Sequence, residues 1–147
     1  MATIGAFGVV IALGRRGEEA EEITDLTGLA SKHPIMSLCL TIFLFSMTGF
    51  PLTVGFVGKF FLFSSAIEAG LYSLVVVGVL NSAVSAYYYL GPVIKMYFGS
   101  DREDSLPEMS YSLLIGIFIC VFLVIYLGVQ PSDIFLMAKE SVRELVF

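Results

Sequence analysis

The stretch that decides the fold is residues 46–59, which read SMTGFPLTVGFVGK. It lies inside an apolar run, residues 34–69, that is longer than the roughly 20 residues one membrane crossing needs. Gly49 has poor helix propensity, and Pro51 removes a backbone donor and clashes with the preceding turn. The sequence therefore predicts one discontinuous helix over residues 34–69. Its halves are expected at about 34–47 and 55–67, joined by an unwound segment around Gly49, Pro51 and Gly55.

Three further apolar runs flank the broken helix. Residues 1–13 are too few to cross a bilayer and predict part of a helix, whereas residues 71–93 and 110–129 are each long enough to span one. Hydrophobic residues make up 57% of the chain and charged residues only 14%, clustered between the apolar runs. This distribution is typical of membrane proteins. The predicted fold is therefore all-α, a single transmembrane helix bundle over residues 1–147.

The charge pattern bears on partners and on orientation. A net charge of −5 and the lack of a basic stripe argue against nucleic acid as a partner.

Basic residues favour the cytoplasmic face of a membrane protein. The loops after the first and third runs hold five of them, and the other face holds two. The count predicts that these loops are cytoplasmic and that the C-terminus is outside; the residues are Arg15, Arg16, Lys32, Lys95 and Arg102 against Lys139 and Arg143.

Lys59 is the first candidate for chemistry. A charged lysine at the middle of a membrane helix costs about 2.5–3.5 kcal/mol on insertion scales. Snorkelling to the interface is the structural alternative, but Lys59 lies about ten residues, or roughly 15 Å, before the turn at residues 68–70. We therefore expect Lys59 to act as a proton relay. Lys59→Met should then leave folding intact or improve it, because the insertion cost of the charge disappears.

Two groups of polar residues could support such a relay. Asn81 and Ser85 share one helix face and could order water beside Lys59, although helix–helix hydrogen bonding explains them equally well. Ser46, Thr48 and Thr53 surround the break and are expected to cap the ends of the half-helices. Cys39, Cys120 and His33 have no partners at metal-ligand spacing, so no metal site is predicted.

Two stretches resemble a known family. Residues 42–60, IFLFSMTGFPLTVGFVGKF, are similar to the broken twelfth helix of the antiporter-like subunits of respiratory complex I, and residues 78–90, GVLNSAVSAYYYL, to the helix that follows it. The first motif is shared with multi-subunit cation/proton antiporters. Within the family, Lys59 and the triple tyrosine at 87–89 favour subunit N, since the sister subunit M has glutamate at the place of Lys59.

The resemblance implies a C-terminal part of a fourteen-helix subunit, containing its last three membrane helices and the end of an eleventh. It implies a proton-translocating subunit of an NADH:quinone oxidoreductase with no redox centre of its own, because NADH, flavin, iron–sulfur clusters and quinone belong to partner subunits. Expected partners are the other membrane subunits, a chain that carries the missing N-terminal helices, and the bilayer. The expected location is the plasma membrane, multi-pass, or else an organellar inner membrane. Two alternatives stay open: a subunit of a cation/proton antiporter, and an inactive product of a split gene.

Overall fold

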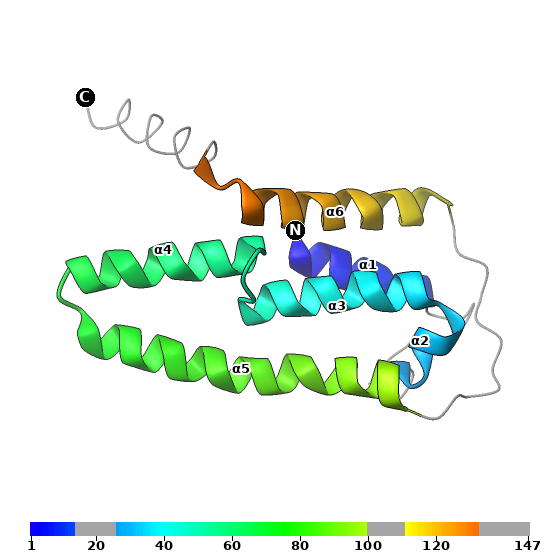
Figure 1. Cartoon of the computed structure of the whole chain (residues 1–147), viewed down its shortest axis with the longest axis horizontal. Coiled ribbons are helices and arrows are strands. Elements are labelled where there is room, and N and C mark those ends of the chain that lie inside the picture. Colours follow the sequence, from blue (N-terminus) through cyan, green and yellow to red (C-terminus); the bar gives the residue numbers. More distant parts are fainter. Residues whose placement is uncertain (14–25, 100–110, 133–147) are drawn as a thin grey trace.

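The computed structural model describes residues 1–13, 26–99 and 111–132, and the regular elements in these ranges are all helices (Figure 1). The helices, in chain order, are α1 (Ala2–Leu13), α2 (Leu29–Lys32), α3 (Pro34–Thr48), α4 (Val54–Glu68), α5 (Tyr72–Phe98) and α6 (Tyr111–Val129). The all-helical architecture expected from the sequence is confirmed for the described part of the chain.

The apolar run 34–69 forms two helices, α3 and α4, with a break between them. Pro34 lies at the start of α3, where its missing N–H would be unpaired in any case, and Gly49 ends the helix with φ +93°. The halves contain 15 residues each, about 22 Å, so neither alone crosses a hydrocarbon core of about 30 Å. Figure 1 shows α3 and α4 one after the other along the length of α5.

The hydrophobic core lies between α1, α3 and α6. Val9, Phe43 and Val124 are completely buried there, one from each helix. Gly5 allows the close approach of α1 and α3, because a Cβ at this position would collide with the Phe43 ring. The core thus fixes α3, the first half of the broken helix, between two neighbours.

The third run differs from the expectation at its end. The sequence predicts a helix over residues 71–93, but α5 continues through Pro92 to Phe98. Met96 in this last turn is fully buried in the core, and the Gly28 N–H donates to the Lys95 carbonyl over 3.3 Å. Packing and this tertiary cap therefore outweigh the tendency of Pro92 to end the helix.

The second half of the molecule has little core of its own. No residue of α4 is buried, and Met96 is the only buried residue of α5. Large apolar side chains along α5 are exposed, among them Leu74, Val77, Leu80 and Val84. An apolar surface of this extent has to be covered by lipid or by other helices.

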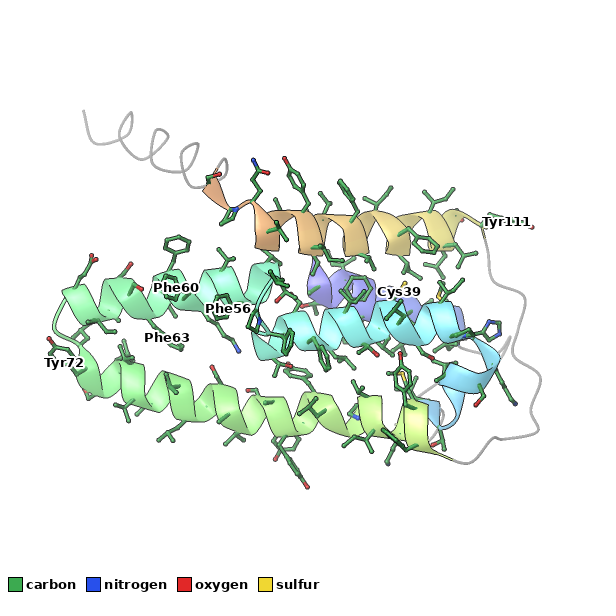
Figure 2. All side chains as sticks on the ribbon, viewed as in Figure 1. Cys39, Phe56, Phe60, Phe63, Tyr72 and Tyr111 are labelled. Carbon is green, nitrogen blue, oxygen red and sulfur yellow. The ribbon has the colours of Figure 1, made fainter. Side chains whose placement is uncertain are left out.

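Length and composition agree with a membrane environment. Among the described residues, α5 (27 residues) and α6 (19 residues) are apolar and long enough to cross a bilayer. Figure 2 shows Tyr72 and Tyr111 at opposite ends of the molecule, and both side chains are exposed, as in the aromatic belts of membrane proteins. Most residues used for the orientation, namely Arg15, Arg16, Arg102, Lys139 and Arg143, lie outside the described ranges.

Candidate functional site: the break between two half-helices

The C-terminal end of α3 is closed in part by its own backbone. The Phe50 N–H donates to the Phe45 carbonyl over 2.9 Å, and the Gly49 N–H, 3.1 Å from each, donates to the carbonyls of Phe45 and Ser46. This is the Schellman pattern, and the Phe45 and Phe50 rings pack against each other at 5.3 Å, which is its usual apolar contact. Two of the last four carbonyls of α3 are thereby satisfied.

The other two carbonyls, those of Met47 and Thr48, lose their helical partners because of the sequence itself. The donor for Met47 would be residue 51, which is proline and has no N–H. The donor for Thr48 would be Leu52, which lies beyond the end of the helix with φ +72°. Both carbonyls therefore need a donor from elsewhere, since an unpaired backbone group at membrane depth costs several kcal/mol.

Lys59 supplies that donor. Its Nζ lies 2.8 Å from the Thr48 carbonyl oxygen and 3.2 Å from that of Met47. The side chain thus reaches back from α4 to the end of α3, and not toward the turn at residues 68–70 as snorkelling would require. The positive charge also faces the negative end of the α3 dipole, which adds a favourable electrostatic interaction.

The start of α4 receives a matching contact from α3. The Gly55 N–H donates to the Ser46 hydroxyl over 3.3 Å, and Ser46 is 1% exposed. The N–H groups of Phe56 and Val57 donate to the Thr53 carbonyl, so these first-turn donors of α4 are paired as well. Each half-helix therefore caps the other: Ser46 serves α4, and Lys59 serves α3.

The expected caps are only partly correct. Ser46 does cap a half-helix end, but the one that follows. Thr48 instead donates its hydroxyl proton to the Leu44 carbonyl within α3 (2.7 Å). Thr53 occupies the N-cap position of α4, yet its hydroxyl donates to the Phe50 carbonyl (2.6 Å) and makes no cap hydrogen bond. A hydroxyl can act as a donor or as an acceptor. The hydroxyls of Thr48 and Thr53 each donate to a carbonyl three or four residues earlier, and among the described residues neither accepts a hydrogen bond from an N–H at a helix end.

Close backbone contacts hold the break in place. A Cβ on Gly55 would collide with the Ser46 carbonyl oxygen, and a Cβ on Gly128 of α6 would collide with the backbone of Leu52 and Thr53. The contribution of Gly128 could not be inferred from the sequence, because the signal is one small residue far along the chain. The left-handed conformation of Leu52, a non-glycine residue, could not be inferred either.

The other predicted site residues lie around the break in different ways. Gly49 is in direct contact with Lys59, since a Cβ added to this glycine would lie 3.0 Å from Lys59 Cδ, and Pro51 is exposed in the turn. Asn81 is exposed on α5, while Ser85 is half-buried and donates its hydroxyl proton to the Asn81 carbonyl of the same helix (2.8 Å). The water-lining role of these two residues therefore stays a prediction.

The electrostatic surroundings of Lys59 are simple in the described part of the chain. The helices that α4 contacts, α3, α5 and α6, contain no carboxylate, and their one charged residue is Lys95 in the last turn of α5. Glu68 ends α4 nine residues on, about 13 Å along the helix axis. Within the described ranges no group of His, Cys, Asp and Glu residues could hold a metal ion. The site is thus an ammonium at a break between two helices, bound to carbonyl oxygens.

A break of this kind is restricted in where it can occur within a membrane protein. Unwound backbone at bilayer depth occurs where it is buried in protein or lines a water-filled cavity, and half-helix ends are recurrent ion sites in transporters. Lys59 is half-buried among the described residues.

Comparison with known proteins agrees with this description. Residues 1–85 match the family described as NADH:quinone oxidoreductase/Mrp antiporter, TM. The chain is 38% identical over 141 residues to NADH-quinone oxidoreductase subunit N of Trichlorobacter lovleyi, 39% over 139 residues to subunit N 2 of Koribacter versatilis, and 37% over 142 residues to subunit N of Paramagnetospirillum magneticum. These alignments cover 95%, 94% and 97% of this chain but only 29%, 28% and 29% of the relatives. Because the family match covers more than half of its residues, the chain belongs to the NADH:quinone oxidoreductase/Mrp antiporter transmembrane family of membrane proteins.

Proposed function

We propose that this chain is a proton-translocating part of an NADH:quinone oxidoreductase, equivalent to a C-terminal portion of its subunit N. The observation that carries the proposal is the position of Lys59, whose ammonium lies at the break of a membrane helix and is bound to the carbonyls of Met47 and Thr48. The names of the relatives support the assignment to subunit N.

In this proposal Lys59 is the group that takes up and releases protons. The break supplies a hydrated path to it, and Asn81 and Ser85 on α5 line that path with polar groups. Movement of a proton away from Lys59 leaves a neutral amine with two N–H donors but removes the positive charge that faces the carbonyls of Met47 and Thr48. Proton release would therefore weaken the contact between Lys59 and the end of α3, because the interaction with the helix dipole is lost.

Electron transfer takes place outside this chain. NADH, flavin, iron–sulfur clusters and quinone are bound by partner subunits, and this chain contributes to the membrane arm. We place it in the plasma membrane as a multi-pass subunit with its C-terminus outside, in accordance with the distribution of basic residues. An organellar inner membrane is the second candidate location.

The exposed apolar faces of α4 and α5 indicate what the chain needs around it. The relatives are more than three times as long as the aligned part, and their further helices are suitable partners for these faces. We propose that helices equivalent to the part of subunit N outside the aligned region, together with the other membrane subunits of the complex, cover them.

A cation/proton antiporter subunit is the second candidate, because the matching family contains both kinds of protein. The two functions differ in their driving force. An antiporter moves protons in response to a Na⁺ or K⁺ gradient without NADH, whereas the oxidoreductase subunit moves them only during electron transfer. An inactive product of a split gene would do neither.

The test compares two lysines in the complete complex in membrane vesicles. Lys59→Met removes the amine at the break, and the matched control Lys95→Met removes an exposed lysine from the last turn of α5. Proton uptake during NADH oxidation should fall sharply in the first variant and stay unchanged in the second. Full pumping by an assembled Lys59→Met complex would refute the relay.

A further inference from the structure

The end of α3 has the properties of a cation site, whatever its role in pumping. Two carbonyl oxygens, those of Met47 and Thr48, converge on one point from a helix C-terminus, where the helix dipole is negative. Neither has a backbone donor at the usual position, because residue 51 is proline and residue 52 lies outside the helix. In this chain a positive group, Lys59 Nζ, occupies that point.

We propose that the carbonyl end of α3 is a binding site for a monovalent cation, and that the Lys59 ammonium is the tethered ion that fills it and excludes Na⁺. Lys59 is thus a residue that determines specificity for protons. The consequence for pumping rests on the proposed function; the binding site does not.

The chemistry of the site favours a small monovalent ion. Backbone carbonyls can replace the hydration shell of an alkali cation, and half-helix C-termini coordinate such ions in other membrane proteins. Divalent ions in protein sites usually have one or more carboxylate ligands, and α3, α5 and α6 contain none. The described residues supply two ligands, and Lys59 is half-buried among them, so the remaining ligands of a bound ion would be water or groups of neighbouring helices.

Gly49 leaves room for the ion. A Cβ on this residue would lie 3.5 Å from Lys59 Nζ, an ordinary contact distance, and 3.0 Å from Lys59 Cδ, so the Lys59 side chain would have to shift by a few tenths of an ångström. The positive φ of +93° that ends the helix also disfavours other residues at this position. Helix termination and the placement of the Lys59 side chain at the carbonyls therefore depend on the same glycine.

The tether explains why Na⁺ is excluded. An ammonium attached to the neighbouring half-helix binds the carbonyls intramolecularly, at an effective concentration that a free ion does not match. Its positive charge also repels a second cation. When Lys59 is replaced by a short neutral residue, the carbonyls stay in place and the competing ion is gone. Na⁺ should then bind.

The experiment uses the complete purified complex in four forms: wild type, Lys59→Ala, Lys59→Arg and Lys95→Ala. The midpoint of thermal unfolding is measured with increasing NaCl, with choline chloride at equal ionic strength as the control for salt effects. The midpoint of Lys59→Ala should rise with NaCl and saturate, and not with choline chloride. The other three forms should respond equally to both salts, because the guanidinium of Lys59→Arg would keep a cation at the site and Lys95 is remote from it.

Direct binding of radioactive ²²Na⁺ gives a second readout. The apparent affinity of Lys59→Ala should exceed that of wild type by at least about tenfold, because the tethered competitor has been removed. If Lys59→Ala assembles poorly, recovery of the complex from membranes prepared in NaCl is compared with recovery in choline chloride. Better recovery in NaCl supports the site, and equal recovery contradicts it, as does equal thermal stability in the two salts.

These outcomes are separate from those of the pumping test. A Lys59→Ala complex that binds Na⁺ and still pumps would support the cation site and refute the relay. A complex that neither binds Na⁺ nor pumps would refute the site and leave the relay standing.

Discussion

Lys59 Nζ lies 2.8 Å from the carbonyl oxygen of Thr48, a residue 11 positions earlier that belongs to the other half of the broken helix. The contact is one of a reciprocal pair, since Ser46 of α3 accepts a hydrogen bond from the Gly55 N–H of α4. The break is therefore a joint in which each half supplies what the other lacks. A substitution in α3 or in α4 at these contacts should therefore destabilise both half-helices.

Ser46→Ala tests the neutral half of this pair. The variant removes the acceptor of the half-buried Gly55 N–H, and losing such a cap should lower the free energy of unfolding by about 1 kcal/mol. Ser65→Ala is the matched control, because Ser65 is exposed on α4 and bonds only within its own helix. The thermal stability of the complex should fall for the first variant alone. Equal midpoints would show that the Ser46 contact contributes nothing.

Gly55→Ala tests the close approach of the two halves. A Cβ at this position would overlap the backbone carbonyl of Ser46, which cannot rotate away. The halves would have to separate, and overpacking of this kind should lower the free energy of unfolding by about 1–3 kcal/mol. Gly58 lies on the same helix and a Cβ there would meet nothing within 4 Å, so Gly58→Ala should be neutral or slightly stabilising. Comparable losses in both variants would mean that glycine is needed for some reason other than this contact.

The sequence predicts the existence of the break but not its internal connections. Gly49 and Pro51 act through local backbone chemistry, so their effect on the helix can be read from neighbouring residues. The same local argument shows that Met47 lacks a donor. Which side chain provides one depends on how α4 is turned relative to α3, and a sequence contains no direct information on that angle.

Contacts between distant glycines and their neighbours could not be predicted for a similar reason. Gly5 lies against Phe43, Gly78 against Phe63, and Gly128 against the backbone of the break. Figure 2 places Phe63 between α4 and α5, in agreement with its contact with Gly78. Each pair depends on the register of two helices, which is a property of the packed structure. The extension of α5 past Pro92 is likewise a result of tertiary packing around Met96.

Ser37→Ala should have the opposite sign to Ser46→Ala. Ser37 is completely buried in α3, and its hydroxyl has no hydrogen-bond partner among the described residues. Since a buried unpaired hydroxyl costs about 1–3 kcal/mol, its removal should leave thermal stability unchanged or raise it. A loss as large as that of Ser46→Ala would indicate that the Ser37 hydroxyl binds a buried water molecule in the assembled protein.

Lys59→Arg separates the two roles assigned to this residue. The sequence alone leads us to expect that Lys59→Met folds as well as wild type or better. The structure changes this expectation, because the variant leaves the carbonyls of Met47 and Thr48 unpaired, and this cost offsets the insertion energy that removing the charge saves. Arginine keeps a cation and several donors at the break, so Lys59→Arg should be more stable than Lys59→Met. It should nevertheless pump poorly, since a guanidinium does not give up its proton at accessible pH.

The measurement is proton uptake by vesicles during NADH oxidation, normalised to assembled complex, beside the thermal midpoint of each variant. A purely structural lysine predicts that pumping follows stability, with arginine nearly as active as wild type. A relay predicts that pumping is lost in both variants although only Lys59→Met is destabilised. Normal pumping by Lys59→Arg would show that Lys59 only caps the end of α3. A cap needs a hydrogen-bond donor and a positive charge, which arginine provides, but it needs no exchangeable proton.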